Sequence, residues 1–388
     1  MKILITADTY YPHVNGCSYF TQRLAYNLAR FGHEVRVLAP SMSLENTDET
    51  KNGVRVCGVR SFPILFYHEF RFCVVLWKNS FIESVIDDFK PDIVHLQGHF
   101  AISRYAMKYA QRKNIPVVAT NHFMPENIIH YVPFNSLIGP TVMRLAWKDF
   151  AGVFGKVRQI TTPTRIASKL IQPYFKHTIH PISCGIDLDI FKPNNNGDYL
   201  KEKYHLTDKP ILLYVGRLDR EKNIDLVIRA VAKALKKASF QYVIAGTGAE
   251  RNNLEGIMSD LGIGDSVRLL GFVKNEDLPN LYAIAKCFAI AGHAELQSIV
   301  TMEAMATGLP VLALNAVALP ELVRDGQNGF LFEADNSDLL AEKIVTIFTD
   351  ENLRKDMGKK SLEFIQEHGI RNTISKFENL YRGEINIK

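Results

Sequence analysis

The sequence predicts an α/β protein made of two doubly wound, Rossmann-like domains facing a central cleft. A chain of 388 residues exceeds the length at which single hydrophobic cores usually divide. Short β-branched runs alternate with longer amphipathic segments in both halves, which is typical of parallel sheets covered by helices. The alternation pauses at residues 187–210, a polar stretch with Pro, Gly and several Asn that we interpret as a linker.

The first half contains five runs that we expect to be buried parallel strands. They lie at residues 2–6, 33–40, 92–96, 116–120 and 159–164. Amphipathic helical patterns separate them, for example at 18–32, where Gly32 marks a helix C-terminus. We therefore place an N-terminal domain at residues 1–190.

The second half repeats the pattern with six further expected strands. They lie at residues 211–216, 241–246, 266–273, 286–292, 310–314 and 329–332. We place the C-terminal domain at residues 191–371 and expect the last helix, about 372–388, to pack back onto the N-terminal domain. Ligands of doubly wound sheets bind beyond the carboxyl ends of the strands, so candidate site residues are sought in the loops there.

Composition is that of an ordinary soluble enzyme, with 47% hydrophobic and 22% charged residues. A net charge of +5 suits an anionic ligand or a membrane surface, but is too small to indicate nucleic acid.

The five cysteines lack CxxC spacing, which disfavours a disulfide framework or a zinc site. The N-terminal stretch does not resemble a signal peptide, and no apolar run is long enough to cross a bilayer. We expect a cytoplasmic protein whose charge would also suit the inner face of the membrane.

One candidate site is the loop after the strand that ends near Gly216. Arg217 and Lys222 follow that strand, and a helix begins shortly after them. A guanidinium fork and an ammonium could together clamp a diphosphate. Alternatively, the loop is solvated and its cations pair only with Asp219 and Glu221.

A second candidate site is the segment AELQSIVTMEAMATGLPVLA at 294–313. Glu295 precedes a helix, and Glu303 lies about one and a half turns inside it. The helix N-terminus between them suits a phosphate. Its expected phosphate-binding residues are Gln297, Ser298, Ile299 and Val300. The pattern fits a ligand with phosphate in its middle and hydroxyls at both ends, such as a nucleotide-diphosphate sugar. Alternatively, both acids are merely exposed, although the apolar neighbours of Glu303 disfavour this.

These segments resemble the retaining glycosyltransferases of family four, which have the two-domain GT-B fold. The two glutamates with seven residues between them, followed by AMATGLPVLA, resemble the acid pair of that family. VGRLDREKN resembles its diphosphate-binding segment, and VIAGTGAER, LLGFV and LPELVRDGQNGFLF match its nucleotide-domain pattern. TADTYYPHVNG, GHEVRVLAP and PDIVHLQGH resemble pieces of its N-terminal domain. The resemblance spans nearly the whole chain.

The resemblance implies roles for the candidate residues. Arg217 and Lys222, following Gly216, would hold the donor diphosphate and stabilise the charge that develops on it. Glu303 would bind the ribose hydroxyls, and Glu295 the donor sugar.

Further roles follow from the same resemblance. Backbone near Phe272 and Val273 would meet the base. Gly16, without a side chain, would allow close approach to the donor, and His122 would contact the donor sugar.

The sequence departs from the family pattern after the first glutamate. Where a small residue and Phe-Gly are common, Leu296, Gln297 and Ser298 stand. Gln297 is similar to the residue found in lipid-glycosylating members, such as diacylglycerol glucosyltransferases and phosphatidylinositol mannosyltransferases. The basic, aromatic segment 121–159 could lie in a lipid headgroup layer. Alternatively, it forms core helices with solvated cations.

The predicted function is hexosyl transfer with retention, from a donor of the UDP-glucose or GDP-mannose type to an acceptor hydroxyl. The expected acceptor is a membrane glycolipid such as diacylglycerol, although a polysaccharide or a soluble acceptor would also fit. A sugar-nucleotide epimerase of the same fold and a non-enzymatic sugar-binding protein are two competing functions. We expect no cofactor and no nucleic acid partner, and the sequence leaves the oligomeric state open.

Several residues receive structural interpretations instead. Arg251 replaces the third Gly of a dinucleotide fingerprint, which disfavours NAD. Asp187 and Asp189 are interpreted as turn residues, and no metal site is expected. The histidines have no metal-ligand spacing; they are His95, His99, His122 and His130.

Overall fold

The computed structural model describes residues 1–13, 15–63, 71–73, 75, 78–123 and 135–384. The chain forms two compact units. Unit 1 comprises Met1–Cys184 with Thr373–Lys388, and unit 2 comprises Gly185–Asn372. The boundary between unit 1 and unit 2 therefore follows Cys184, a few residues before the expected boundary at 190. The segment Thr373–Lys388 belongs to unit 1.

Unit 1 contains an eight-stranded sheet with the order β10-β9-β8-β7-β1-β2-β4-β3. Every neighbouring pair is parallel except β3 and β4. Its strands are β1 (Lys2–Thr6), β2 (Glu34–Pro40), β3 (Thr47–Lys51), β4 (Val54–Val59), β7 (Ile93–Leu96), β8 (Val117–Thr120), β9 (Gln159–Thr162) and β10 (Ile179–Pro181). A separate hairpin pairs β5 (Ser61–Pro63) with β6 (Arg71–Cys73). The five expected strands correspond to β1, β2, β7, β8 and β9.

The strands that the sequence did not predict lie towards the edges of this sheet. Asn52 and Gly53 join β3 to β4 as a hairpin and both have positive φ, as a tight primed turn requires. The β3 residues TDETK are mostly exposed, so this edge strand carries none of the apolar pattern that identified the others.

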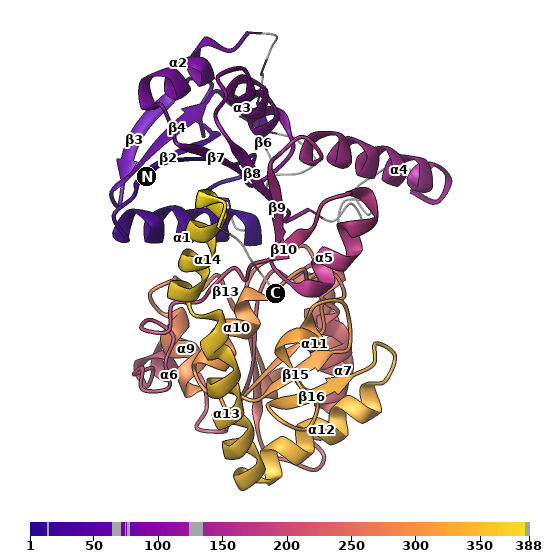
Figure 1. Cartoon of the computed structure of the whole chain (residues 1–388). Helices are drawn as coiled ribbons and strands as arrows, with labels where there is room; N and C mark the ends of the chain where they lie inside the picture. The colour runs from indigo at the N-terminus through magenta and orange to yellow at the C-terminus, as the bar shows by residue number, and fades with distance from the viewer. Residues whose placement is uncertain (14, 64–70, 74, 76–77, 124–134, 385–388) are drawn as a thin grey trace. The chain divides into compact units, whose positions relative to one another are not determined.

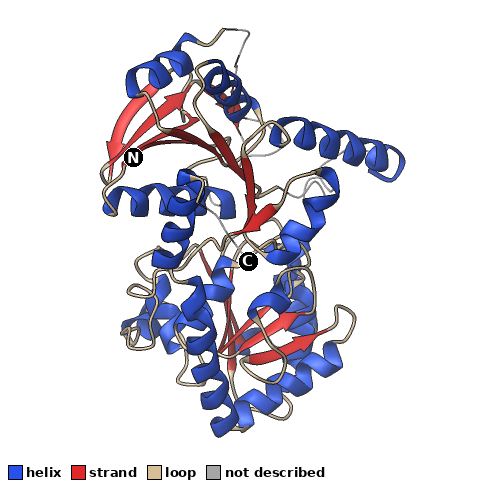
Figure 2. Cartoon of the chain, viewed as in Figure 1, coloured by secondary structure: helices blue, strands red, loops and turns tan. Residues whose placement is uncertain are grey.

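Helices flank the sheet of unit 1 (Figure 2). They are α1 (Gly16–Arg30), α2 (Ser80–Phe89), α3 (Ala101–Arg112), α4 (Asn135–Phe154), α5 (Arg165–Ile171) and α14 (Ile370–Arg382), with a 3-10 turn at Gln172–Tyr174. Asn15 caps α1 by accepting a hydrogen bond from the backbone N–H of Ser18 at 2.9 Å.

The last helix packs within unit 1, beside α1 (Figure 1). Nε2 of His33 lies 2.7 Å from Oε1 of Glu378 on α14. The ring of Phe377 contacts the ring of Phe20 on α1, with centroids 6.1 Å apart. Residues far apart in sequence therefore form one core.

Unit 2 contains a fully parallel six-stranded sheet with the order β13-β12-β11-β14-β15-β16. Its strands are β11 (Ile211–Val215), β12 (Gln241–Ala245), β13 (Val267–Gly271), β14 (Cys287–Ile290), β15 (Val311–Leu314) and β16 (Gly329–Phe332). All six correspond to expected strands. The strand order reverses between β11 and β14, so the loops that follow these two strands meet at the topological switch point.

The helices of unit 2 complete the two-sided covering of its sheet (Figure 2). They are α6 (Tyr199–Lys203), α7 (Ile224–Ala234), α8 (Arg251–Asp260), α9 (Leu278–Ile284), α10 (Ile299–Ala306), α11 (Leu319–Leu322), α12 (Ser337–Thr349) and α13 (Glu351–Ile365). Short 3-10 turns occupy Arg220–Lys222, Gly264–Ser266 and Gln366–His368.

The interpretation of residues 187–210 as a linker was wrong, because this segment belongs to unit 2 and contains α6. Asp277 holds the helix through two short hydrogen bonds of 2.6 Å, one from the Tyr199 hydroxyl and one from Lys203 Nζ. Leu200 is fully buried. The polar composition thus marks a surface helix anchored by one carboxylate.

Candidate functional site

Lys222 and Glu295 form the centre of the candidate site in unit 2. Lys222 lies in the loop after β11, and Glu295 lies in the loop between β14 and α10. Nζ of Lys222 donates to Oε1 of Glu295 at 2.7 Å, and both side chains are 16% exposed. The two loops that meet at the switch point are therefore joined by an ion pair with restricted access to water.

The charge of Lys222 persists despite its burial. Burial by itself disfavours the ammonium, but Glu295 and Glu221 outweigh that effect, so the pKa of Lys222 is raised above its ordinary value. Nζ lies 3.3 Å from Oε1 of Glu221. The ammonium is thus available as a fixed positive charge at neutral pH.

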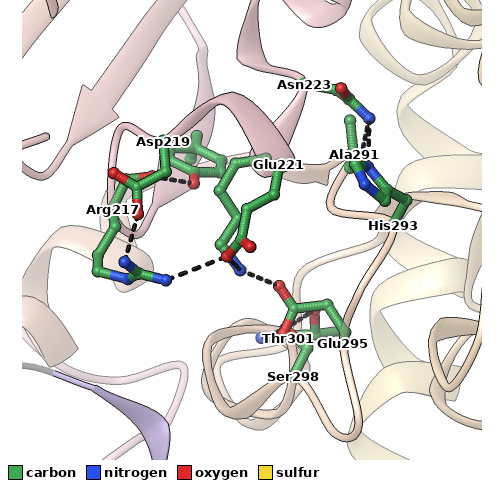
Figure 3. Close-up of polar contacts among 11 residues, drawn as sticks. Arg217, Asp219, Glu221, Asn223, Ala291, His293, Glu295, Ser298 and Thr301 are labelled. Carbon is green, nitrogen blue, oxygen red and sulfur yellow. Dashed lines mark hydrogen bonds and ion pairs between the residues drawn. The ribbon is translucent and has the colours of Figure 1, made fainter. Parts of the chain in front are cut away.

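Arg217 lies on the same loop and is held by two acids (Figure 3). Its Nη2 donates to Oε1 of Glu221 at 3.0 Å, and its Nη1 forms a close ion pair with Asp219. The guanidinium remains 28% exposed. The pairing with Asp219 and Glu221 considered above is present, but Glu221 also links Arg217 to Lys222, so the two cations form one cluster.

Glycines allow the backbone segments of this cluster to approach closely. Gly216 has φ of +155° and Gly246, after β12, has φ of +151°. A Cβ on Gly246 would collide with the carbonyl oxygen of Gly216, and a Cβ on Gly292 would lie 2.9 Å from Oε1 of Glu295. Glycine at these positions therefore reflects close packing of the loops.

Helix α10 begins at Ile299, one or two residues after the start near Gln297 or Ser298 that the sequence predicts. Ser298 is the N-cap, and its Oγ accepts from the backbone N–H of Thr301 at 3.3 Å. Ile299 and Val300 form the first turn and are half-buried, as is Gln297 in the preceding loop. First-turn N–H groups have no intrahelical acceptor, so this helix end retains the capacity to bind an anion.

Glu303 is buried inside α10, with 7% of its surface exposed. Its Oε2 accepts a hydrogen bond from the hydroxyl of Tyr282 on α9 at 2.9 Å. A solvated surface position is therefore excluded for this acid. Because Tyr282 takes up part of the carboxylate's capacity, the acid is fixed in orientation before any ligand binds.

The expected base-binding residues follow β13. Phe272 is 61% exposed, whereas Val273 is 5% exposed. An exposed aromatic ring beside a strand end is a surface on which a planar base can stack. These positions, with Gly216 and the α10 residues, all belong to unit 2.

Gly16 and His122 belong to unit 1. Gly16 is the first residue of α1, and a Cβ placed on it would meet no heavy atom within 4 Å. His122 follows β8, is half-buried, and its Nε2 lies 2.9 Å from Oε1 of Gln97. Burial lowers the pKa of His122 to about 3, so the ring is neutral at physiological pH.

Sequence reasoning missed several residues that shape these positions. They are Gly292, Tyr282, Glu221 as a bridging acid, and Gln97. Only Gly292 had a visible signal, as the glycine that ends a predicted strand. The contribution of Tyr282 and Gln97 depends on tertiary contacts that spacing does not reveal.

Of the two acids interpreted as turn residues, Asp187 has that role through its side chain. Oδ1 of Asp187 accepts from the backbone N–H of Asp189 at 3.0 Å and from that of Ile190 at 3.3 Å. Within the described residues no cluster of three or more potential ligands could hold a metal ion. His130 lies outside the described residues.

The basic, aromatic segment 121–159 is described only at 121–123 and 135–159. The aromatic rings of Phe150 and Phe154 are buried in the core of unit 1, and Trp147 stacks on Tyr174 with centroids 4.7 Å apart. Within the described part of this segment, Phe150 and Phe154 are therefore packed inside unit 1 and do not face a lipid layer.

Cations of the same segment nevertheless lie outside. A groove of about 460 Å³ between α3 and α4 is lined by Arg104, Met107, Lys108, Leu145, Lys148, Asp149, Gly152, Val153 and Lys156. Arg104 pairs with Asp149 at 2.5 Å, while the three lysines are exposed. We call this the basic groove. No helix in the described part of the chain has the length and apolar character needed to span a bilayer.

Two family profiles cover most of the chain. Residues 14–190 match Glycosyltransferase Family 4, and residues 198–364 match Glycosyl transferases group 1. The chain belongs to the family 4 glycosyltransferases. The expectation drawn from the acid pair and the Arg/Lys loop is thereby confirmed at the level of the family.

Individual relatives of the glycosyltransferase agree with this assignment. It is 27% identical to alpha-monoglucosyldiacylglycerol synthase of Streptococcus pneumoniae, over 97% of this chain and 88% of the relative. It is also 27% identical to a GDP-mannose-dependent alpha-mannosyltransferase of Mycobacterium tuberculosis, over 85% and 83% of the two chains.

Solved structures confirm that the glycosyltransferase has the GT-B fold. Sucrose-phosphate synthase from Thermosynechococcus elongatus matches with a TM-score of 0.79 at 21% identity, covering 99% of this chain and 98% of that one. Anabaena HepE, in complex with UDP and glucose, matches with a TM-score of 0.77 at 19% identity, covering 99% and 100%.

Proposed function

We propose that this glycosyltransferase moves a hexose from a nucleotide-diphosphate sugar to an acceptor hydroxyl, with retention of the anomeric configuration. The observation that carries the proposal is the ion pair between Lys222 and Glu295 at the switch point of unit 2. The ammonium and the carboxylate lie side by side immediately before the N-terminus of α10, which supports a diphosphate subsite next to a sugar subsite.

The proposed donor site uses charges that are already in position. The diphosphate binds to Arg217 and Lys222 and to the first turn of α10, displacing part of their contacts to Glu221 and Glu295. Glu295, released from Lys222, accepts from a hydroxyl of the hexose. Glu303, oriented by Tyr282, accepts from the ribose hydroxyls at the other end of the helix turn.

The proposed reaction is a front-face displacement. The bond between the anomeric carbon and the diphosphate oxygen breaks while the acceptor oxygen forms a bond on the same face. The acceptor proton passes to the departing diphosphate oxygen. Negative charge grows on the diphosphate in the transition state, so Arg217 and Lys222 lower the barrier by electrostatic stabilisation.

Two cations at this position make a divalent metal unnecessary for charge neutralisation. We therefore propose metal-independent transfer, with turnover maintained in the presence of excess chelator. A loss of turnover in EDTA that is restored by added Mg²⁺ or Mn²⁺ would contradict this part of the proposal.

The proposed acceptor is a membrane lipid such as diacylglycerol, which transfer converts into a glycolipid at the inner face of the membrane. Two observations support it. The pneumococcal relative is named for synthesis of a glucosyldiacylglycerol. The exposed lysines of the basic groove offer positive charge to anionic lipid headgroups, next to Leu145, which is 60% exposed.

Product analysis tests the proposed function directly. UDP-glucose and GDP-mannose are each incubated with the full chain, with and without diacylglycerol in mixed vesicles. Transfer predicts an α-linked glycolipid and release of nucleoside diphosphate only when acceptor is present. Conversion of the donor sugar without acceptor would favour an epimerase, and a β-linked product would contradict retention.

A further inference from the structure

A chain of buried hydrogen bonds runs from His122 to the last helix of the protein, within unit 1. Nε2 of His122 lies 2.9 Å from Oε1 of Gln97, and Nε2 of Gln97 lies 3.1 Å from Nε2 of His95. Nδ1 of His95 lies 2.8 Å from the hydroxyl of Tyr381 on α14. His95, Gln97 and Tyr381 are each at most 3% exposed, so bulk water cannot replace these partners.

Both histidines in this hydrogen-bond network, His95 and His122, are neutral. Burial lowers the pKa of His95 to about 3 and that of His122 to about 3. A neutral imidazole carries one N–H donor and one lone pair. The amide of Gln97 has one donating and one accepting end. The nitrogens that face it from the two rings must therefore differ, one with a hydrogen and one without.

The orientation of the Gln97 amide determines which atom donates and which accepts in each hydrogen bond of this network. Its oxygen accepts from Nε2–H of His122, and its nitrogen donates to the lone pair on Nε2 of His95. The hydroxyl of Thr120, 2.7 Å away, donates to the same lone pair. His95 consequently carries its hydrogen on Nδ1 and donates it to the oxygen of Tyr381.

We propose that Tyr381 is a positioning residue that determines which ring nitrogen of His122 carries the hydrogen, acting through His95 and Gln97. The selected tautomer leaves Nδ1 of His122 as an acceptor for a hydroxyl group, whereas the other tautomer would make it a donor. The last helix of the chain thereby sets the hydrogen-bonding character of a candidate sugar-contacting residue. Only the consequence for catalysis rests on the proposed function; the coupling of tautomers does not.

The wild-type protein provides the first test. Long-range ¹H–¹⁵N correlation spectra of full-length protein labelled with ¹⁵N-histidine, recorded without donor, report the tautomer of each ring. We expect the hydrogen on Nε2 in His122 and on Nδ1 in His95. Finding the same tautomer in both rings would overturn the proposal.

The Tyr381→Phe variant provides the second test, because it keeps the ring and removes only the hydroxyl. The Nδ1–H of His95 then loses its acceptor, and a buried N–H without an acceptor is rarer and costlier than an unpaired lone pair. We expect His95 to move its hydrogen to Nε2, the Gln97 amide to rotate, and His122 to move its hydrogen to Nδ1. Retention of Nε2–H in His122 would overturn the proposal.

A matched control separates this effect from loss of packing. The ring of Phe377 lies 5.3 Å from that of His95 but has no hydrogen-bonding group. Phe377→Leu should therefore leave both tautomers unchanged. In Tyr381→Phe we expect kcat to fall about tenfold with a nearly unchanged donor KM. If the tautomers switch but kcat stays at the wild-type value, His122 does not use this hydrogen in transfer. That result would overturn the positioning role and leave the coupling of the tautomers in place.

Discussion

Lys222 and Glu295 are 73 residues apart in the sequence, yet their side chains meet at 2.7 Å. The contact exists because β11 and β14, the strands that precede the two loops, are neighbours in the sheet. A cation and an acid that follow different strands thus form one ion pair. Replacing either residue should therefore change the rate of donor turnover.

Replacing Lys222 by methionine should reduce donor turnover by about 10²–10³-fold, because it removes one charge from the developing diphosphate. Lys203→Met is the matched control, since Lys203 also forms an ion pair of 2.6 Å, with Asp277, but away from this loop. Initial rates with saturating acceptor measure both variants. Near wild-type rates for Lys222→Met would contradict the assignment of this cation.

Replacing Glu303 by glutamine should mainly weaken donor binding. A charged acceptor of a hydroxyl hydrogen bond contributes about 1.5–3 kcal/mol, which corresponds to a donor KM raised roughly 10- to 100-fold. Tyr282→Phe keeps the carboxylate and loses only its orienting donor, so its effect should be smaller. Titration calorimetry with the nucleoside diphosphate checks both, and equal losses would contradict a direct role of Glu303.

Replacing Gly16 by alanine should leave the fold intact and lower kcat/KM about tenfold or more, equivalent to ~1.4 kcal/mol. The added methyl group meets no protein atom within 4 Å, so a loss of activity would come from the ligand that approaches there. Gly256→Ala in α8 is the control, because its Cβ also enters open space. An unchanged kcat/KM in Gly16→Ala would argue against donor approach at this position.

The buried histidines should make unit 1 sensitive to acid. In the unfolded chain a histidine binds a proton below a pKa of about 6.5, whereas in the folded protein burial lowers the pKa of His95 to about 3. The unfolded state therefore binds more protons, and stability present above pH 6.5 is lost as the pH falls towards 3. Each such histidine contributes a slope of ~1.4 kcal/mol per pH unit.

Tryptophan fluorescence can follow this loss selectively, because Trp77 and Trp147 both fall within the sequence range of unit 1. Urea unfolding between pH 7 and pH 4.5 should give a shallower dependence for His95→Gln than for wild type. His293→Gln, at an exposed position in unit 2, should not change the slope. Parallel slopes for His95→Gln and wild type would contradict the prediction.

Neutralising the basic groove should weaken binding to anionic vesicles. Each basic residue near such a surface contributes about 1 kcal/mol, so Lys108→Gln with Lys148→Gln should cost about 2 kcal/mol, roughly 30-fold in affinity. Lys51→Gln with Lys90→Gln, at other exposed positions of unit 1, is the control. Sedimentation with phosphatidylglycerol-containing vesicles measures the difference. Equal binding by both double variants would exclude the groove as the contact surface.

All strands of unit 2 could be predicted because they are short, mostly apolar runs, and four of them are buried on both faces, such as ILLYV at Ile211–Val215. The strand Thr47–Lys51 was missed because an exposed edge strand needs no apolar residues. The helix Tyr199–Lys203 was mistaken for linker because its anchor, Asp277, is distant in sequence.

The candidate site shows the same division. Arg217, Lys222, Glu295 and Glu303 could be selected as candidates from the sequence, because they resemble a known family pattern. The hydroxyl that orients Glu303 and the amide that binds His122 could not, because Tyr282 and Gln97 act through contacts between separate elements. Spacing along a chain carries no information about such partners.

The assignment of Thr373–Lys388 to unit 1 also constrains biosynthesis. A ribosome releases the N-terminal sheet and all of unit 2 before it makes the helix that carries Phe377 and Tyr381. During that interval His95 lacks its phenolic partner and the surface later covered by α14 is open to water or to chaperones. Completion of unit 1 therefore waits until α14 has been made, and deleting α14 should impair unit 1 before unit 2.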